Sequence, residues 1–415
     1  MTDGIAAARG RRSAPRSWVA SWTLYDLANT IWSYGVLSYA VGLYLTSDAG
    51  FGEAAGNIWL QVAIAASVGL NALLSPAIGA LSDRTGRRLP WLFLFTLVAI
   101  LPSMAIPFVP PVAGVLLFCV ANFGYQSALI HYDASIRLVS TVTNRGWISG
   151  LGNGLGYLGT VLIGALILFG GLSVQQVFIV APLLFGLLAL PIFLVLRETP
   201  APRTGPAVGI LPVRATLHTI RELDRYPGLR RFLIARFFYT DALNTVIVVM
   251  AVFAVQAVGF TEAQANYVLV ALATTAVVGG IILGRVTDRF GPKRTLMIVL
   301  TLWAVGLLIA SLAIAPVPFI LAGVVIGFGF GGLSASDRVL MLRLSPADRL
   351  GEFYGLYGLV GKGSQVIGGI VYGLTVGVLL GPLGVVAYQI GLLTLLGTML
   401  IGMWLLRGVP ERAEA

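Results

Sequence analysis

The sequence is poor in the residues that enzymes and metal sites use most. Its 415 residues include one cysteine, Cys119, so the chain forms no intramolecular disulfide and no thiolate metal cluster. Two histidines, His131 and His218, are too few for a zinc site by themselves. The sequence also holds no nucleophile–base set and no Walker A motif. We therefore expect no enzyme activity, no cofactor, no bound metal and no direct use of ATP.

Charge is also scarce. Charged residues make up 11% of the chain, against about 25% in soluble domains. They fall in short clusters between apolar runs of about 20 residues, a length that crosses the hydrocarbon core of a bilayer as a helix. The sequence therefore predicts an all-α membrane protein. Its net charge of +10 fits basic loops and no nucleic-acid partner. The expected partners are membrane lipids and a small solute, and the expected state is a monomer.

The apolar runs predict twelve transmembrane helices. They lie near residues 18–46, 57–81, 89–109, 112–136, 147–170, 176–196, 231–258, 264–285, 294–314, 317–342, 352–377 and 383–406. The loops on one side of these helices carry the Arg and Lys residues. The loops on the other side carry only Asp48, Glu53 and Glu262 as charges. Because basic loops stay in the cytoplasm, both termini are expected there, in a multi-pass protein of the cell (inner) membrane.

The chain contains an internal repeat. "GALSDRTGRR" (79–88) returns as "GRVTDRFGPKR" (284–294), and "SGLGNGLGYLG" (149–159) returns as "YGLYGLVGKGS" (354–364), each about 205 residues later. "DLANT" (26–30) returns as "DALNT" (241–245). Copies of the same orientation predict two parallel, pseudo-symmetric six-helix bundles. The predicted parts are a cytoplasmic tail at 1–17, bundles at 18–196 and 231–406, a cytoplasmic linker at 197–230, and a second tail at 407–415.

Several motifs resemble those of a known family. Both copies of the Gly-x-x-x-Asp-Arg-x-Gly loop resemble the signature of the major facilitator superfamily. "LYDLANT", "TNRGWISGLGNGLGYLG", "RFLIARFFYTDALNTVI" and "GFGFGGLSASDR" resemble motifs of its vacuole-effluxer (unknown-major-facilitator) family, although Leu27 and Thr30 replace the usual aromatic residue and serine. This resemblance implies the major facilitator fold. Fungal relatives are associated with the release of amino acids from the vacuole.

Polar residues inside the apolar runs are candidates for a central cavity. They are Asp26, Asn29, Asn122, Gln126, Asp241, Asn244 and Lys362. An acid inside a membrane helix indicates a functional site, although it can also hydrogen-bond a neighbouring helix. Lys362, one of two lysines, lies near the expected midplane and requires a counter-ion, which Asp26 or Asp241 would supply. Alternatively, Lys362 attracts a carboxylate of the substrate.

Other charged residues lie at the predicted cytoplasmic ends of the helices. The candidates for a cytoplasmic gate are Asp83, Arg84, Arg88, Asp133, Arg137, Arg145, Asp288, Arg289, Lys293, Asp337, Arg338 and Arg349. We expect them to cap neighbouring helix ends and to pair across the cytoplasmic mouth, the alternative being solvated loop charges. Arg236 is expected to extend toward the interface. His131 is expected to face lipid or to pack, in preference to relaying protons. Gly154, Gly156 and Gly159 are expected to pack helices closely, because no βαβ unit surrounds them.

Together these patterns predict a secondary transporter that exports a small solute, such as an amino acid or a similar metabolite, by alternating access. Protons are the expected coupling ion, because desolvation of a buried acid favours its protonated form. One alternative is a drug or sugar-type porter of the same superfamily. The other is a non-transporting membrane receptor or scaffold, for which the sequence offers no sizeable soluble domain.

Overall fold

The computed structural model describes residues 14–198 and 219–411, and these two ranges contain helices and no strand. The helices of the first range are α2 (Arg16–Trp32), η1 (Ser33–Ala40), α3 (Val41–Thr46), α4 (Glu53–Thr85), α5 (Leu89–Ala105), η2 (Ile106–Phe108), α6 (Pro111–Val139), α7 (Arg145–Gly170) and α8 (Val174–Val195). Those of the second are η3 (Leu223–Arg225), α10 (Leu229–Gln256), α11 (Glu262–Phe290), α12 (Pro292–Ser311), α13 (Pro316–Leu344), α14 (Leu350–Leu383) and α15 (Val386–Arg407).

The helices follow the predicted apolar runs to within a few residues. In the described ranges, ten of them are long and apolar enough to cross a membrane. The first run, which is long enough to contain a re-entrant end, instead forms one continuous helix in which the π-helix η1 joins α2 to α3. Of the predicted linker, residues 199–218 lie outside the described ranges. Residues 219–222 are helical.

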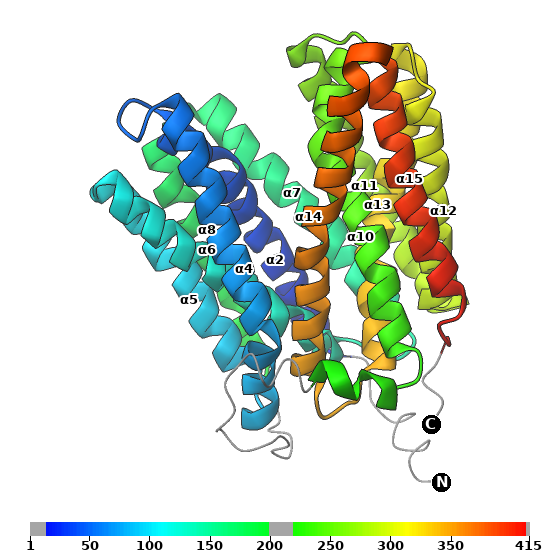
Figure 1. Ribbon diagram of the computed structural model, residues 1–415. Helices are drawn as coiled ribbons and strands as arrows, with labels where there is room; N and C mark the ends of the chain where they lie inside the picture. The colour runs from blue at the N-terminus through cyan, green and yellow to red at the C-terminus, as the bar shows by residue number, and fades with distance from the viewer. Residues whose placement is uncertain (1–13, 199–218, 412–415) are drawn as a thin grey trace.

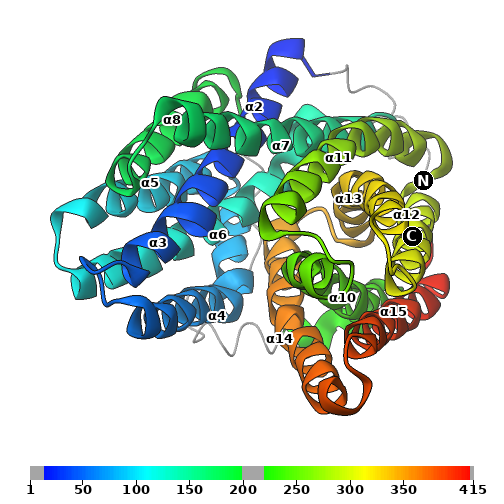
Figure 2. The same ribbon diagram turned by 90° about the horizontal axis from the view of Figure 1, so that it is seen from above.

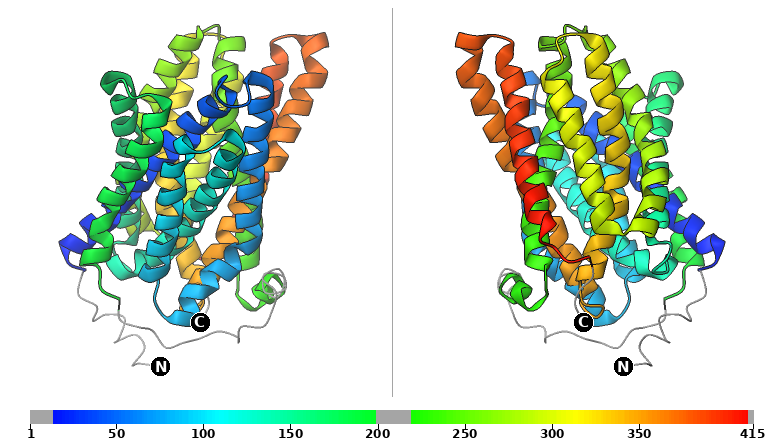
Figure 3. Two further views of the ribbon diagram at one scale, coloured as in Figure 1. Left: turned by 90° about the vertical axis from the view of Figure 1, so that its left-hand side faces the viewer. Right: turned by 90° about the vertical axis from the view of Figure 1, so that its right-hand side faces the viewer.

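The helices form two groups that meet at one end. Figure 1 shows α2 to α8 on the left and α10 to α15 on the right, close together at the lower end and apart at the upper end. In Figures 1 and 3, α2 begins and α15 ends at this lower end. Seen from above in Figure 2, α4 packs against α14 and α7 packs against α11. These two helix pairs form the largest contacts between the groups.

Glycines bring both helix pairs into backbone contact. A Cβ atom on Gly79 of α4 would lie 1.8 Å from the carbonyl oxygen of Gly351 of α14. One on Gly150 of α7 would lie 2.1 Å from the carbonyl oxygen of Gly280 of α11. A larger residue therefore cannot replace these glycines without separating the helices. In the first copy of the loop motif, Gly86 ends α4 with a φ of 66°, a left-handed conformation that favours glycine.

The glycines of α7 also hold this helix close to α2. A Cβ atom on Gly159 would lie 2.3 Å from the carbonyl oxygen of Leu27, and one on Gly152 would lie 2.7 Å from the ring of Trp22. The G-x-G-x-x-G run is therefore a helix-packing surface, as the sequence predicts. α7 thus contacts α2 of its own group and α11 of the other, and both contacts depend on small residues.

Candidate functional site

A polar cavity of about 310 Å³ lies between the two groups of helices. It is lined by α6 and α7 of the first group and by α10, α13 and α14 of the second. Its polar and charged lining residues are Gln126, Asp133, Asn153, Tyr157, Arg236, Thr240, Asn244, Ser334, Asp337, Tyr354, Tyr357 and Lys362. A few convergent polar groups in a concave site are typical of small-molecule binding.

One ion pair in the cavity lies within the second group. Arg236 of α10 donates to Asp337 of α13 at 2.7 Å, and its guanidinium lies 3.5 Å from the centre of the Tyr357 ring. Asp337 also accepts hydrogen bonds from Tyr239 at 2.8 Å and from Tyr357 at 3.0 Å. The prediction that Arg236 extends to the interface is therefore wrong. This side chain is buried because its charge is neutralised locally.

A second ion pair joins the two groups. Nε of Arg338, on α13, lies 3.0 Å from a carboxylate oxygen of Asp133, on α6. The guanidinium also lies 5.6 Å from the ring centres of both Trp22 and Tyr132. Because its partners come from the first group while Arg338 belongs to the second, separating the groups at this level would break the pair. A buried pair resists such separation, since each charge left alone is poorly solvated.

Lys362 differs from the two arginines because it has no carboxylate partner. Its ammonium group, on α14, donates to Oδ1 of Asn71 on α4. Asn71 is fully buried, and its Nδ2 donates to the Ser127 hydroxyl at 2.7 Å. Neither Asp26 nor Asp241 serves as the expected counter-ion in this conformation. Among the described residues that line the cavity, the cations are Arg236 and Lys362 and the carboxylates are Asp133 and Asp337. Asp337 pairs with Arg236, and Asp133 pairs with Arg338, which lies outside the lining, so Lys362 is the lining cation without a carboxylate partner.

Asp26 is buried beside the cavity and not among its lining residues. One oxygen accepts a hydrogen bond from Asn29 at 3.0 Å, as the shared helical face predicts. The other oxygen is buried and has no hydrogen-bond partner in the described ranges. An ionised carboxylate with an unpaired buried oxygen is unfavourable, whereas protonation of that oxygen removes its charge.

Asp241, the second copy of this acid, has a different environment. Its Oδ1 accepts the backbone N–H of Gly368, on α14, at 2.6 Å. A Cβ atom on Gly368 would lie 2.8 Å from both carboxylate oxygens, so glycine makes this approach possible. Asp241 therefore faces α14 and does not line the polar cavity, in contrast to our expectation. Its hydrogen bond to backbone joins α10 to α14.

The remaining cavity candidates divide in the same way. Gln126 and Asn244 line the cavity, on α6 and α10. Asn122 is fully buried instead, and it donates to the Ser67 hydroxyl on α4 at 2.8 Å. Asn29 accepts a hydrogen bond from Tyr125 at 3.4 Å. The two asparagines that do not line the cavity therefore make hydrogen bonds between helices.

The two aspartates of the repeated loop motif each bind a helix of the other group. Asp83, at the end of α4, accepts the backbone N–H groups of Gly351 at 3.0 Å and Glu352 at 2.9 Å, at the start of α14. Asp288, at the end of α11, accepts those of Gly146 and Trp147, at the start of α7, both at 2.7 Å. A carboxylate satisfies the unpaired N–H groups of a helix N-terminus and complements its dipole.

The other gate candidates surround these two contacts. Arg88 donates to Asp83 at 3.3 Å, and Arg137 donates to the carbonyl of Ala347 at 3.2 Å. Lys293 donates to the carbonyl of Arg407 at 2.8 Å, and the Arg289 guanidinium lies 5.4 Å from the ring centre of Phe290. Arg84 follows Asp83 in α4, and Arg145 is the first residue of α7. Asp133, Asp337 and Arg338 lie deeper, at the polar cavity.

Arg349 holds the turn between α13 and α14. It donates to both oxygens of Glu352 at 2.8 Å, and to Glu222 at 2.8 Å. Because of the hydrogen bonds to Glu352, and next those to Glu222, the pKa of Arg349 lies above its usual value despite partial burial. Arg349 is therefore charged at every accessible pH. It ties the segment before α10 to the helix end that Asp83 caps.

His131 packs and does not face the cavity. It is fully buried, and its ring stacks on Phe95 of α5 with the ring centres 5.6 Å apart. Neither ring nitrogen has a hydrogen-bond partner among the described residues. Of the two placements expected from the sequence, facing lipid or packing inside the protein, His131 has the second.

Sequence reasoning missed two residues of the cavity network. Asn71 is the one amide in a serine-bearing stretch of α4, where Ser67 and Ser75 lie one turn away on the same face. Asn153 lies in the glycine-rich run of α7, and its Nδ2 donates to the carbonyl of Gly331 at 3.3 Å. An amide inside an apolar run was the available signal in both cases.

Comparison with known sequences gives one family. Residues 137–406 match the family described as vacuole effluxer Atg22 like. The chain is 23% identical over 413 residues to an uncharacterized MFS-type transporter, YxiO, of Bacillus subtilis, and this alignment covers 95% of each chain. It is 27% identical over 169 residues to autophagy-related protein 22 of Pichia angusta, covering 38% of this chain and 30% of that protein.

Comparison with solved structures gives the fold. The human organic anion transporter MFSD10 matches with a TM-score of 0.79 at 15% identity, over 94% of this chain and 100% of that one. A bacterial homologue of the iron transporter ferroportin, in an outward-facing state, matches with a TM-score of 0.70 at 16% identity, over 94% and 98%. The major facilitator superfamily transporter FucP, in the outward conformation, matches with a TM-score of 0.67 at 14% identity, over 94% and 99%.

Proposed function

Because the chain belongs to the Atg22-like vacuole effluxer family of major facilitator transporters, we propose that it exports a small solute bearing a carboxylate, such as an amino acid. The observation that carries this proposal is Lys362, the cavity cation without a carboxylate partner in the described ranges. A substrate carboxylate would complete the charge balance that Asp337 and Asp133 supply for the two arginines. A sugar-type porter has no use for an unpaired ammonium group.

The transport cycle we propose is alternating access between two six-helix bundles, each crossing the membrane six times, with residues 197–230 as the linker. The basic loops and both tails lie in the cytoplasm, and the membrane is the cell (inner) membrane. The cytoplasmic side is the closed side of this conformation. Three groups of contacts support this assignment: the Asp83 cap, the Asp288 cap and the Arg338–Asp133 pair, all between the two bundles.

Asp26 is the proposed site of proton coupling. One of its carboxylate oxygens is buried without a hydrogen-bond partner in the described ranges, and ten residues of α2 separate it from the start of that helix. It also lies against Gly152 and Gly156 of α7, the helix that contacts the other bundle. Deprotonation would therefore place a charge where α2 and α7 meet and would bias the equilibrium between conformations. We propose that the transporter acts as a monomer.

Flux in sealed vesicles tests the function. Purified protein is reconstituted in vesicles loaded with radiolabelled amino acids, and efflux is measured with and without a pH gradient. We expect the gradient to increase efflux of carboxylate solutes. Lys362→Met should abolish this efflux and Lys362→Arg should retain part of it, because arginine keeps the charge. Equal transport of uncharged sugars by all three proteins would overturn the carboxylate proposal. Absence of flux, despite ligand binding, would favour a receptor.

Cysteine labelling tests the topology. Cys119 is first replaced by serine, and a single cysteine is then introduced at Asp48 or Arg87, exposed residues beyond opposite ends of α4. In intact cells, an impermeant maleimide should label the cysteine at position 48 and not that at position 87. Labelling at both positions from one side would contradict the proposed orientation.

A further inference from the structure

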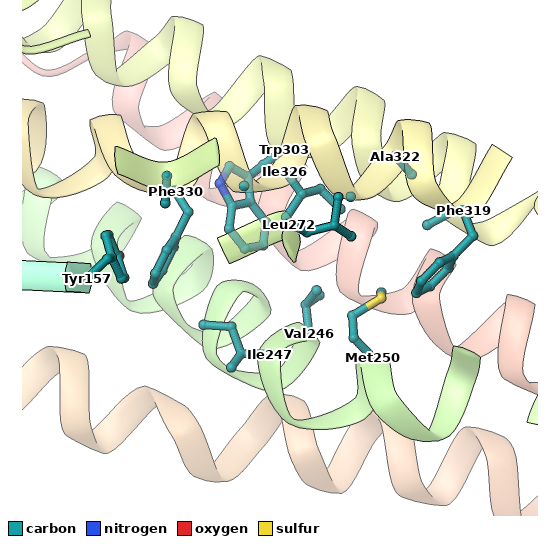
Figure 4. Close-up of a pocket in the computed structure, with 14 residues that line it drawn as sticks. Tyr157, Val246, Ile247, Met250, Leu272, Trp303, Phe319, Ala322, Ile326 and Phe330 are labelled. Carbon is teal, nitrogen blue, oxygen red and sulfur yellow. The ribbon is translucent and has the colours of Figure 1, made fainter. Parts of the chain in front are cut away.

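A second cavity, also of about 310 Å³, lies inside the second group of helices. Figure 4 shows it between α10, which contributes Val246, Ile247 and Met250, and the opposite wall formed by residues such as Trp303 and Phe319. Its lining side chains are apolar apart from the polar ends of Tyr157 and Trp303. The side chains that line it carry no charge, in contrast to the polar cavity.

The two cavities share a wall. Tyr157 of α7 and Phe330 of α13 line both of them, and their ring centres lie 5.8 Å apart. Both side chains are only partly buried. Since Tyr157 belongs to the first group and Phe330 to the second, this aromatic boundary is made by both halves. The two rings therefore form a common boundary between the polar and the apolar cavity.

The apolar cavity is too large to be a packing defect. Protein interiors contain few voids larger than a water molecule. A cavity of about 150 Å³ lined by apolar residues accepts benzene. The volume here is about twice that, which corresponds to two aromatic rings. The indole nitrogen of Trp303 lies beside Gly329, where a Cβ atom would be 3.2 Å away, so this edge of the ring points to α13.

We propose that this apolar cavity binds the uncharged part of an amphipathic carboxylate about the size of two fused rings, while the carboxylate stays at Lys362. The inference rests on the proposed function and specifies its substrate class. The cargo is therefore larger and more apolar than an aliphatic amino acid. Burial of its ring system in a mostly apolar site supplies affinity, and the charged cavity supplies orientation.

A matched pair of ligands tests this proposal. Alanine and 3-(2-naphthyl)alanine carry the same charged groups and differ in the two-ring substituent. Binding of each to the purified full-length protein is measured by calorimetry. We expect naphthylalanine to bind at least about tenfold more tightly than alanine. Absence of saturable naphthylalanine binding at millimolar concentration, while alanine binds, would overturn the inference and leave the proposed function intact.

A matched pair of variants locates the binding. Val246→Phe fills the cavity from α10, whereas Val248→Phe makes the same change at a side chain of the same helix that is 75% exposed. We expect Val246→Phe to weaken naphthylalanine binding about tenfold and to leave alanine binding unchanged. Val248→Phe should change neither. If Val246→Phe does not fold, Ala322→Leu fills the cavity from the opposite wall. Wild-type naphthylalanine affinity in the folded filling variant would overturn the proposal.

Lys362→Met separates the two proposals. If both are right, this variant weakens alanine and naphthylalanine alike, because both carry the carboxylate. If Lys362→Met changes neither affinity, while Val246→Phe still weakens naphthylalanine binding alone, the apolar site is supported and the role proposed for Lys362 is wrong. If it weakens both while the cavity-filling variants have no effect, the carboxylate site stands and the apolar site falls.

Discussion

The two copies of the repeat are alike at the closed end of the molecule and different in its interior. At the closed end, Asp83 and Asp288 each accept two backbone N–H groups from a helix of the other half, at 2.7 to 3.0 Å. In the interior, one oxygen of Asp26 has no hydrogen-bond partner among the described residues, whereas Asp241 binds the backbone of Gly368. The same motif, Asp-x-x-Asn-Thr, therefore gives two environments.

The interior difference extends to the cavity. Tyr157 stands 205 residues before Lys362, at the spacing that separates the two copies of the glycine-rich motif. Both residues line the polar cavity, one as a neutral phenol and one as an ammonium group. We call the Asp83 and Asp288 contacts together the symmetric lock, because they are alike in the two halves. The residues that line the cavity, in contrast, have diverged between the halves. A solute with distinct ends needs such a difference, because a symmetric cavity would bind it in two orientations.

The largest expected effect comes from making the two copies alike at this position. Lys362→Tyr removes the unpaired cation, and we expect carboxylate binding to fall about 10- to 100-fold, since a hydrogen bond to a charged group contributes about 1.5–3 kcal/mol. Adding Tyr157→Lys returns an ammonium group to the cavity from the other half and should restore part of the binding. Calorimetry with alanine measures both. If Lys362→Tyr binds alanine with wild-type affinity, the difference between Tyr157 and Lys362 has no role in carboxylate binding.

The next effect concerns the symmetric lock. Asp83→Asn and Asp288→Asn each remove a charge from a helix N-terminus of the opposite half. Both should slow transport by a similar factor, about tenfold, and leave ligand affinity within about twofold, because they bias a conformation and lie away from the cavity. Vesicle flux and calorimetry measure the two quantities. A large effect of one variant without the other would show that the lock is not symmetric in function.

The two interior acids should respond differently to loss of charge. Asp26→Asn should abolish pH-gradient-driven transport and retain solute exchange, because exchange does not require the empty carrier to return deprotonated. Asp241→Asn should keep proton coupling and lower stability by about 1–3 kcal/mol, the cost of weakening a buried hydrogen bond. The measurements are gradient-driven flux, counterflow and thermal unfolding. Gradient-driven flux in both variants would remove Asp26 from the coupling mechanism.

Helix positions could be predicted from the sequence because membrane helices are long, uniformly apolar and bounded by charge. The run predicted at 147–170, for example, is α7 (Arg145–Gly170). The capping contacts of Asp83 and Asp288 could also be predicted, since a repeated motif with an acid at a helix end indicates a capping role. The pairing of the halves could not be read in the same way. It depends on which glycine meets which backbone, as for Gly79 and Gly351, and these residues are 272 positions apart.

The cavity was predicted less completely than the helices. Depth in an apolar run identifies a polar residue but does not say which side of the helix faces solute and which faces another helix. Asp241 and Asn122 were expected in the cavity and bind neighbouring helices instead. Arg236 was expected at the interface and lies in the cavity, because its partner Asp337 comes from another helix. Partners distant in sequence decide these positions, and one sequence does not reveal them.

The smallest effect concerns a contact that is described in the second half only. Arg349 joins Glu222 and Glu352, with 19% of its side chain exposed, whereas the nearby pair of Arg230 and Asp224 is mostly exposed. Arg349→Gln should lower the free energy of unfolding by about 1–2 kcal/mol, because it removes the cation paired with Glu352 and one of the two arginines paired with Glu222, which keeps Arg225. Arg230→Gln, the control, should have almost no effect, since exposed pairs contribute little. Thermal unfolding at neutral pH measures both variants. If both variants are equally stable at neutral pH, Arg349 does not fix the segment before α10 to the helix end that Asp83 caps. The cavity residues would then be the remaining difference between the two halves.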